Sequence, residues 1–240
     1  MKDAIVIIPT YNEIENIEAI IIAVFAQNKA FDVLVVDDNS PDLTAEKVES
    51  LQTEFPDRLF LLKREDKTGL GTAYIDGFKW SLAKNYEYIF EMDADFSHNP
   101  EDLGKLYSAC ASDRADVAIG SRYITGVNVV NWPMNRILLS YLASKYVRFI
   151  TRMDIQDTTA GFVCYKRKVL QTINLDTIKF VGYAFQIEMK FKAHLKGFNV
   201  IEIPVIFTDR AKGKSKMSGG IISEAIFGVI TMKFKSLFSK

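Results

Sequence analysis

Apolar residues in the first half of the chain form short continuous runs, separated by stretches with helical spacing. We predict that five of these runs are strands: Ala4–Ile8, Val33–Val36, Leu59–Leu62, Tyr88–Met92 and Val117–Gly120. Between them, apolar residues at i, i+3, i+4 and i+7 predict amphipathic helices, over 14–25, 45–55 and 103–110. Continuously apolar strands joined by helices are typical of a parallel sheet covered on both faces. We therefore predict an α/β fold with a Rossmann-like, mostly parallel sheet flanked by helices.

The second half of the chain is less regular. Its spacing predicts helices over about Met134–Ile150 and Ala184–Lys196, and strands near Phe162–Tyr165 and Val200–Phe207. The segment 209–220 is basic and contains Gly and Ser, which is typical of a loop. The tail after it alternates Ile, Phe, Val, Met and Leu with Glu224, Lys233 and Lys235. This pattern predicts a C-terminal amphipathic helix, packed on the domain or lying in a membrane interface.

The composition fits one domain spanning residues 1–240. Of these residues 48% are hydrophobic and 25% charged, and the 30 basic and 30 acidic residues cancel. A zero net charge argues against nucleic acid as a partner. Cys110 and Cys164 lie in apolar surroundings, and we expect buried free thiols. We expect neither a signal peptide nor a transmembrane helix, because no long uncharged apolar stretch is present.

Polar clusters follow the predicted strands at the points where the strands end. They are Pro9-Thr10-Tyr11-Asn12-Glu13, Asp37-Asp38-Asn39-Ser40-Pro41-Asp42, Arg64-Glu65-Asp66-Lys67, Asp93-Ala94-Asp95 and Gly120-Ser121-Arg122-Tyr123. Any single cluster could be a helix cap or a turn. The carboxyl ends of parallel strands meet at one edge of a sheet, however, and that edge is where ligands bind in open α/β sheets. Five clusters at one edge therefore favour a binding site.

Asp93 and Asp95 are the candidate metal ligands of this site. Side chains two residues apart in an extended segment point the same way. Mg²⁺ or Mn²⁺ commonly uses one or two carboxylates together with phosphate oxygens of a substrate. A separated pair of aspartates alone would more often be a turn or a cap, so the neighbouring clusters carry the interpretation. No G-x-G-x-x-G follows the first strand, which argues against a dehydrogenase.

The order and spacing of these clusters resemble the inverting GT-A glycosyltransferases of family 2. Further motifs resemble the dolichyl-phosphate (polyprenol-phosphate) mannose synthases within that family. These motifs are Met92-Asp93-Ala94-Asp95-Phe96-Ser97-His98, Asp157-Thr158-Thr159-Ala160-Gly161-Phe162, Gly182-Tyr183-Ala184-Phe185-Gln186-Ile187-Glu188-Met189 and Asp209-Arg210 followed by Gly213-Lys214-Ser215-Lys216. The resemblance runs from Ile5 to about Ile230. It implies a GT-A fold with a nucleotide-binding half over about 1–122, an acceptor-binding half over about 123–220 and an interface helix over about 220–238.

The resemblance also implies substrates and roles. The donor would be GDP-mannose with Mg²⁺ or Mn²⁺, and the acceptor a polyprenyl phosphate that becomes a polyprenyl β-mannosyl phosphate. Asp93 and Asp95 would bind the metal, and Arg122 and Arg136 the acceptor phosphate. The residues expected around the nucleotide are Pro9, Tyr11, Glu13, Asp38 and Asp66, with Arg210 and Lys216 in a loop that closes over the donor. Some relatives place a Gln ligand two residues after the second Asp, where this chain has Ser97.

A polyprenyl acceptor implies work at a membrane surface, so we expect a peripheral protein at the cytoplasmic face. The segment 127–134, which contains Trp132, and the C-terminal helix are the candidate lipid contacts. Small membrane partner subunits are a further expectation drawn from relatives. Two alternatives stay open. One is a family 2 transferase that uses a UDP-sugar such as UDP-glucose, with polyprenyl phosphate or a glycan as acceptor. The other is a non-catalytic subunit that binds a nucleotide sugar as a scaffold.

Overall fold

The fold is built around one seven-stranded sheet. The structure, a computed structural model, describes residues 3–209 and 220–238. The strand order is β3-β2-β1-β4-β7-β5-β8. Its strands are β1 (Ala4–Thr10), β2 (Asp32–Asp37), β3 (Leu59–Lys63), β4 (Tyr88–Glu91), β5 (Val117–Ser121), β7 (Val163–Lys166) and β8 (Val200–Pro204). Every pairing is parallel except those of β7, which runs antiparallel between β4 and β5. A small parallel pair, β6 (Val129–Val130) and β9 (Phe207–Thr208), lies beyond the sheet.

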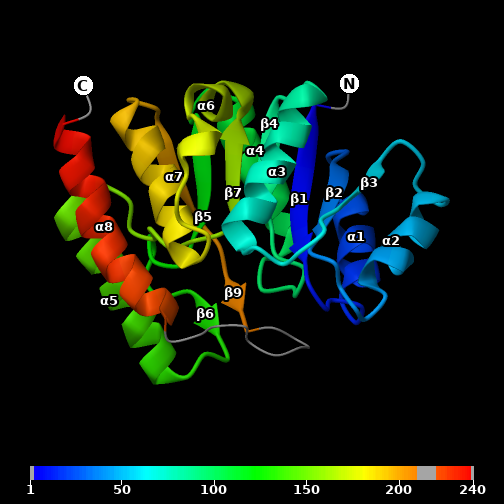
Figure 1. Ribbon diagram of the computed structural model, residues 1–240, viewed down its shortest axis with the longest axis horizontal. Helices are drawn as coiled ribbons and strands as arrows, with labels where there is room; N and C mark the ends of the chain where they lie inside the picture. Colours follow the sequence, from blue (N-terminus) through cyan, green and yellow to red (C-terminus); the bar gives the residue numbers. More distant parts are fainter. Residues whose placement is uncertain (1–2, 210–219, 239–240) are drawn as a thin grey trace.

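Helices cover both faces of this sheet (Figure 1). They are α1 (Ile17–Phe25), α2 (Thr44–Gln52), α3 (Leu70–Ala83), α4 (Leu103–Ala111), α5 (Met134–Thr151), α6 (Arg167–Thr172), α7 (Tyr183–Leu195) and α8 (Gly220–Phe238), with short 3₁₀ turns η1 (Pro100–Asp102) and η2 (Leu175–Thr177). Alternation along β1 sorts the core into two layers. Ile5 and Ile7 pack with residues of α3 and α7, whereas Val6 and Ile8 pack with residues of α1 and α4.

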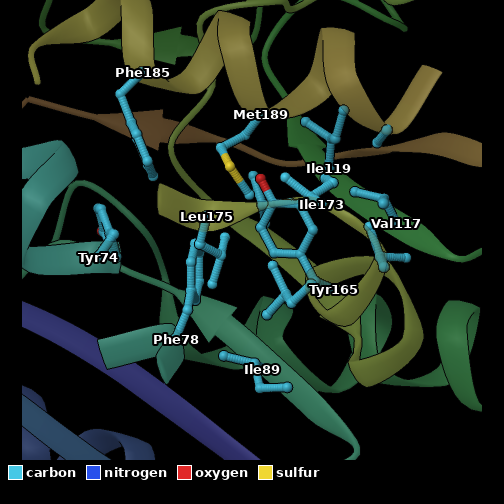
Figure 2. Packing of buried hydrophobic residues seen from close by; sticks show 14 of the residues in the cluster. Tyr74, Phe78, Ile89, Val117, Ile119, Tyr165, Ile173, Leu175, Phe185 and Met189 are labelled. Atoms are coloured by element: carbon cyan, nitrogen blue, oxygen red, sulfur yellow. The ribbon is translucent and has the colours of Figure 1, made fainter. Parts of the chain in front are cut away.

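The layer beneath α3 and α7 is rich in aromatic side chains. Figure 2 shows Phe185 and Met189 of α7 in one cluster with Tyr74 and Phe78 of α3 and with Tyr165 of β7. Tyr74 and Phe185 stack at 5.9 Å between ring centroids. All five side chains are fully buried. This packing fixes α7 against the sheet, so polar groups on the buried face of α7 are held in place as well.

The helix α3 was not among the predicted helices, because four of the six residues on its buried face are small and only Tyr74 and Phe78 are large. Gly71, Ala73, Gly77 and Ser81 all point inward, and a pattern search for large apolar residues passes over them. The reason for glycine at position 77 is close packing: a Cβ there would lie 2.8 Å from the Ile7 side chain. Gly69 directly precedes this helix and has a φ of 116°, a conformation that favours glycine. Gly69 and Gly77 therefore serve the backbone and the packing of α3.

The other predicted strands and helices agree with the structure, except in the extent of one strand. All seven predicted strands are present, and the mostly parallel sheet is confirmed. The predicted strand over 200–207 is wrong in its extent, because the chain leaves the sheet at Pro204 and pairs again only at Phe207. The antiparallel direction of β7 was not foreseen either. Cys110 and Cys164 are buried free thiols, as expected. Among the described residues, no helix is both long and apolar enough to cross a bilayer.

Candidate active site

The polar clusters converge at the carboxyl edge of the sheet, where β1, β2, β4 and β5 end (Figure 1). Asp37, at the end of β2, joins the first two clusters. Its carboxylate accepts hydrogen bonds from Thr10 Oγ1 at 2.7 Å, from Ser40 Oγ at 2.6 Å and from the Ser40 N–H at 2.8 Å. Ser40 Oγ accepts the N–H of Asn12 in turn. Asp37 therefore joins the segments after β1 and β2 into the floor of the candidate site.

The predicted nucleotide-side residues lie around this floor. Pro9 is the penultimate residue of β1, and Lys67 Nζ lies 4.0 Å from the centroid of the Tyr11 ring. Glu13 accepts from Asn16 at 2.9 Å, while its own N–H donates to Thr44 Oγ1. Asp66 is exposed in the segment between β3 and α3. The structure thus brings Tyr11 and Glu13 to the ends of β1 and β2 and leaves Asp66 at the rim.

Arg64 is a candidate site residue that the sequence pattern did not single out. Its guanidinium binds Asp38 at 2.6 Å, Asp76 at 3.0 Å and the hydroxyls of Thr68 and Thr72. Burial raises the pKa of Asp38, and the Arg64 charge opposes that rise. Arg64 therefore fixes the direction of the Asp38 carboxylate and helps to keep it ionised. It stood in the cluster after the third strand, but no sequence pattern pairs it with a residue 26 positions earlier.

The aspartate pair follows β4 directly. Asp95 is buried and accepts the Ser97 N–H at 3.1 Å, whereas Asp93 is half-buried. The N–H of Asp93 donates to His98 Nδ1 at 3.1 Å. Burial lowers the pKa of His98 to about 4, so its ring is neutral at pH 7 and Nδ1 can accept this bond. His98 also stacks on Phe162 at 4.9 Å. It supports the aspartate loop and is not placed as a base.

The donor set of this loop fits a magnesium- or manganese-type ion shared with a substrate. Within residues 3–209 and 220–238, no group of three or more His, Cys, Asp or Glu side chains could enclose a metal. Two carboxylates with open positions are what Mg²⁺ uses when phosphate oxygens complete its shell. Ser97 contributes its backbone N–H to Asp95. Asp93 and Asp95 therefore suit an ion whose coordination shell is completed by phosphate oxygens of a substrate.

Arg122, at the end of β5, is held by a buried carboxylate. Asp157 Oδ2 accepts the Arg122 backbone N–H at 2.9 Å and Nε at 2.7 Å, and Oδ1 accepts Nη2 at 2.5 Å. Thr159 Oγ1 accepts a further bond from Nη2. Asp157 is fully buried and the Arg122 side chain is 9% exposed. Burial opposes ionisation of Asp157, but the guanidinium outweighs it and holds the pKa of that carboxyl below its usual value.

The guanidinium groups of Arg136 and Arg122 both pack against the ring of Trp132. The Arg136 guanidinium carbon is 3.9 Å from the Trp132 ring centroid, and that of Arg122 is 5.5 Å away. Phe207 packs edge-on against the same ring, and Arg136 pairs with Asp209 at 2.7 Å. Trp132, predicted as a lipid contact, is therefore half-buried between protein groups. The Arg136 side chain is 31% exposed, so it is the more accessible of the two arginines.

Two predicted residues cannot be placed. Arg210 and Lys216 lie outside the described residues, and their expected position over the donor stays a prediction. Asp209, directly before them, is described and accepts from Arg136. The structure therefore brings together carboxylates for a cation after β4 and arginines for an anion after β5. Such a site can hold a charged leaving group and a phosphate side by side.

Comparison with solved structures identifies the same fold in other proteins. Glucosyl-3-phosphoglycerate synthase from Mycobacterium tuberculosis, solved with Mn²⁺, UDP and glucosyl-3-phosphoglycerate, superposes with a TM-score of 0.68 at 14% identity. The superposition covers 97% of this chain and 80% of that one. At this identity the likeness shows the fold alone, which is the GT-A fold of nucleotide-sugar-dependent transferases.

The family is shown by sequence. Residues 5–173 match the model of glycosyl transferase family 2. Polyprenol monophosphomannose synthase of Mycolicibacterium smegmatis is 47% identical over 94% of this chain and 84% of that protein. Undecaprenyl-phosphate mannosyltransferase of Micrococcus luteus is 43% identical over 93% of this chain and 90% of that protein. The chain belongs to glycosyl transferase family 2 and is a glycosyltransferase. The resemblance noted in the sequence is confirmed, and the scaffold alternative is disfavoured.

Proposed function

We propose that this enzyme transfers mannose from GDP-mannose to the phosphate of a polyprenyl lipid, giving a polyprenyl β-mannosyl phosphate. The observation that carries the proposal is the pairing of Asp93 and Asp95 with Arg122 and Arg136 at one sheet edge. The first pair suits a metal-bound diphosphate and the second a phosphate nucleophile. The two relatives, a polyprenol monophosphomannose synthase and an undecaprenyl-phosphate mannosyltransferase, support mannose as the sugar and a polyprenyl phosphate as the acceptor.

The nucleotide half of the site supplies donor contacts. In the proposed complex Tyr11 offers a ring face to the base, while Asp38 and Glu13 accept from base N–H groups or ribose hydroxyls. Asp93 and Asp95 would hold Mg²⁺ or Mn²⁺ against the diphosphate. When bound, such an ion acts as a Lewis acid that stabilises the charge developing on the departing nucleoside diphosphate. The Mn²⁺ named with the structural neighbour supports this choice of metal.

The acceptor half needs to position an anion and does not need a base. A phosphate monoester has a second pKa of about 6, so it is largely dianionic at pH 7 and can attack without losing a proton. The neutral, enclosed His98 is consistent with this chemistry. Arg136 and Arg122 can bind phosphate oxygens through paired N–H groups. Attack from the face opposite the leaving group inverts the anomeric carbon, so an α-linked donor gives a β-linked product.

Replacement of Arg64 by methionine should weaken donor binding. The change leaves Asp38 without its guanidinium, so the carboxylate loses both its direction and part of its charge. A hydrogen bond to a charged group contributes about 1.5–3 kcal/mol, so we expect the Kd for GDP to rise about tenfold or more. Isothermal titration with GDP and Mg²⁺ measures the effect. Arg114→Met, at an exposed arginine that donates to Ser112, is the matched control. An unchanged Kd in Arg64→Met would remove Arg64 from the donor site.

A surface for the lipid bilayer is proposed on α5 and α8, which pack side by side (Figure 1). Tyr146 Oη of α5 donates to the Ile226 carbonyl of α8 at 2.8 Å. Both helices expose large apolar side chains: Met134, Leu138, Leu142, Phe149, Phe227, Ile230, Phe234, Leu237 and Phe238. Neither α5 nor residues 226–238 of α8 contain an acidic residue, while Lys145, Arg148, Lys233 and Lys235 are basic. An apolar face with basic flanks matches an anionic membrane surface. We place this surface at the cytoplasmic leaflet.

The double variant Phe234→Asp/Leu237→Asp should release the protein from vesicles. Each large apolar side chain contributes about 1.5–3 kcal/mol when buried, so we expect at least about tenfold weaker binding to phosphatidylglycerol-containing vesicles. Co-sedimentation measures it. Leu195→Asp, at a leucine of α7 that is about as exposed, should bind normally, and the double variant should keep its transfer activity in detergent. Equal sedimentation of both variants would contradict the assignment. If the wild type fails to bind, a small membrane partner subunit becomes the better occupant of this face.

Donor choice separates the main proposal from its alternative. The structural neighbour carries UDP, which keeps a UDP-sugar donor such as UDP-glucose as a second candidate. Purified enzyme with Mg²⁺ and a short polyprenyl phosphate in detergent should release GDP from GDP-mannose, with little UDP released from UDP-glucose. Turnover of UDP-glucose alone would move the donor assignment to the alternative. It would leave the metal and acceptor sites as proposed.

A further inference from the structure

Helix α7 carries a lysine whose charge is enclosed by the protein core. Lys190 is fully buried. Its ammonium donates to the Ala160 carbonyl at 2.6 Å and to the backbone and side-chain oxygens of Gln186, both at 3.2 Å. Gln186 Nε2 donates in turn to Glu91 Oε2 at 2.7 Å. Glu91 and Gln186 are buried as well. A continuous chain of hydrogen bonds therefore runs from Ala160 through Lys190 and Gln186 to Glu91.

Stability alone does not account for this chain of polar groups. Burial opposes the charge of Lys190 and lowers the pKa of its ammonium group, which reflects the cost of holding a charge away from water. Apolar residues of similar size at such positions often give an equally stable or more stable protein. The surroundings could accept them, since Tyr165, Phe185 and Met189 pack in the same layer (Figure 2).

The two ends of this hydrogen-bond chain, Glu91 and Ala160, lie in the two halves of the candidate site. Glu91 is the last residue of β4 and stands two positions before Asp93. Ala160 belongs to the loop that presents Asp157 to Arg122. Glu91 therefore stands just before the loop that carries Asp93 and Asp95. Ala160 lies in the segment that orients Arg122.

The loop is also held from its other side. Glu202 of β8 accepts the N–H of Gln156 at 2.7 Å and that of Asp157 at 2.8 Å. Lys190 binds the carbonyl of Ala160, which lies three residues after Asp157 in the same segment. With both faces of the loop fixed, the Asp157 carboxylate can meet Nε and Nη2 of Arg122 at once. Releasing either anchor leaves the loop free to shift, and Arg122 would shift with it.

We propose that Lys190 is a positioning residue for the transfer reaction. By joining Ala160 to Gln186 and Glu91, it fixes the acceptor arginine relative to the aspartates that follow β4. Lys190 touches neither substrate, and its effect passes through Asp157 and Arg122. The inference rests on the proposed function, because it takes Arg122 as an acceptor-phosphate ligand. It extends that function by naming what holds the donor and acceptor sites at a fixed separation.

The test uses the charge-balanced variant Lys190→Met/Glu91→Gln, because Lys190→Met alone would leave Glu91 buried without its counter-charge. We expect a folded protein whose kcat falls about 10- to 100-fold, since misplacement of a reacting group by about 1 Å costs on that order. The Kd for GDP with Mg²⁺ should stay within about threefold, because the change keeps Asp93 and Asp95, and because Tyr11, Glu13 and Asp38 lie at the ends of β1 and β2. A merely structural role would lower the melting temperature without separating kcat from donor affinity.

Two further variants complete the test. Lys192→Met removes a lysine of the same helix that pairs with Glu188 near the surface, and it should keep wild-type kcat. Glu202→Gln weakens the other anchor of the loop and should also lower kcat. This variant replaces the double variant in the test if the double variant does not fold. If the folded double variant keeps wild-type kcat, the inference is wrong and the proposed function still stands. The same conclusion holds if the double variant is unfolded and Glu202→Gln keeps wild-type kcat. A wild type that transfers no sugar to polyprenyl phosphate overturns the proposed function, and the inference with it.

Discussion

Replacing Asp95 with alanine is expected to abolish sugar transfer while the protein stays folded. Asp95 follows β4, and its Oδ1 accepts the Ser97 N–H, which fixes the carboxylate at the carboxyl edge of the sheet. Without it a cation would keep one protein carboxylate, Asp93, and would hold the diphosphate poorly. Stabilisation of a leaving diphosphate by a metal is worth several kcal/mol, and each 1.36 kcal/mol is a factor of ten. We expect kcat/KM to fall about 10³-fold or more.

The measurement is transfer by purified Asp95→Ala over a range of Mg²⁺ and Mn²⁺ concentrations, with thermal unfolding alongside. Removal of metal from the wild type by EDTA should have the same effect and should be reversed by added Mn²⁺. Asp176→Ala, at an exposed aspartate that pairs with Lys79, controls for loss of a carboxylate far from the site. Transfer by Asp95→Ala within tenfold of the wild type would show that Asp95 is not a metal ligand.

Replacing Arg122 with alanine is expected to destabilise the whole protein. The change leaves Asp157, which is fully buried, without the guanidinium that neutralises it. Breaking a buried ion pair costs about 3–5 kcal/mol. In a protein of this size about 1 kcal/mol corresponds to roughly 2–4 °C, so the melting temperature should fall by about 10 °C. The double variant Arg122→Ala/Asp157→Ala removes both charges and should recover part of the loss.

Arg136 provides the contrast that isolates acceptor binding. It is more exposed, and its partner Asp209 is a third exposed as well, so Arg136→Ala should keep nearly the wild-type melting temperature. It should instead raise the KM for polyprenyl phosphate by about tenfold, with the Kd for GDP unchanged. Thermal unfolding and steady-state kinetics on the same preparations separate the two effects. A melting temperature of Arg122→Ala equal to that of Arg136→Ala would show that the Asp157 pair contributes little to stability.

Many of the residues at the carboxyl edge of the sheet could be predicted, because the signals that place them lie close together in the sequence. Each strand is a short apolar run, each is followed by polar residues, and parallel strands end at the same edge of a sheet. Asp38, Asp93 and Arg122 could be placed in this way before any contact was known. The family motifs supplied roles for these positions, and the comparisons confirm the family.

What could not be predicted depends on long-range pairing. β7 enters the sheet antiparallel between β4 and β5, and this insertion brings the Asp157 loop to Arg122. Arg64 and Asp38 are 26 residues apart, and Gln186 and Glu91 are 95 apart. No periodicity links such pairs, because they are set by packing between elements. α3 was missed for another reason: four of its six buried residues are small, so Tyr74 and Phe78 alone do not give a clear helical pattern of apolar residues.

The most direct test of the central proposal is transfer of radiolabelled mannose from GDP-mannose to a short polyprenyl phosphate in detergent, compared with the same polyprenol lacking phosphate. We expect a metal-dependent, mild-acid-labile mannolipid from the phosphate alone, because the nucleophile is the phosphate oxygen. Its anomeric carbon should be β-linked. Equal labelling of the free alcohol, or an α-linked product, would contradict the mechanism. No labelled lipid with GDP-mannose at any metal concentration would contradict the proposed function itself.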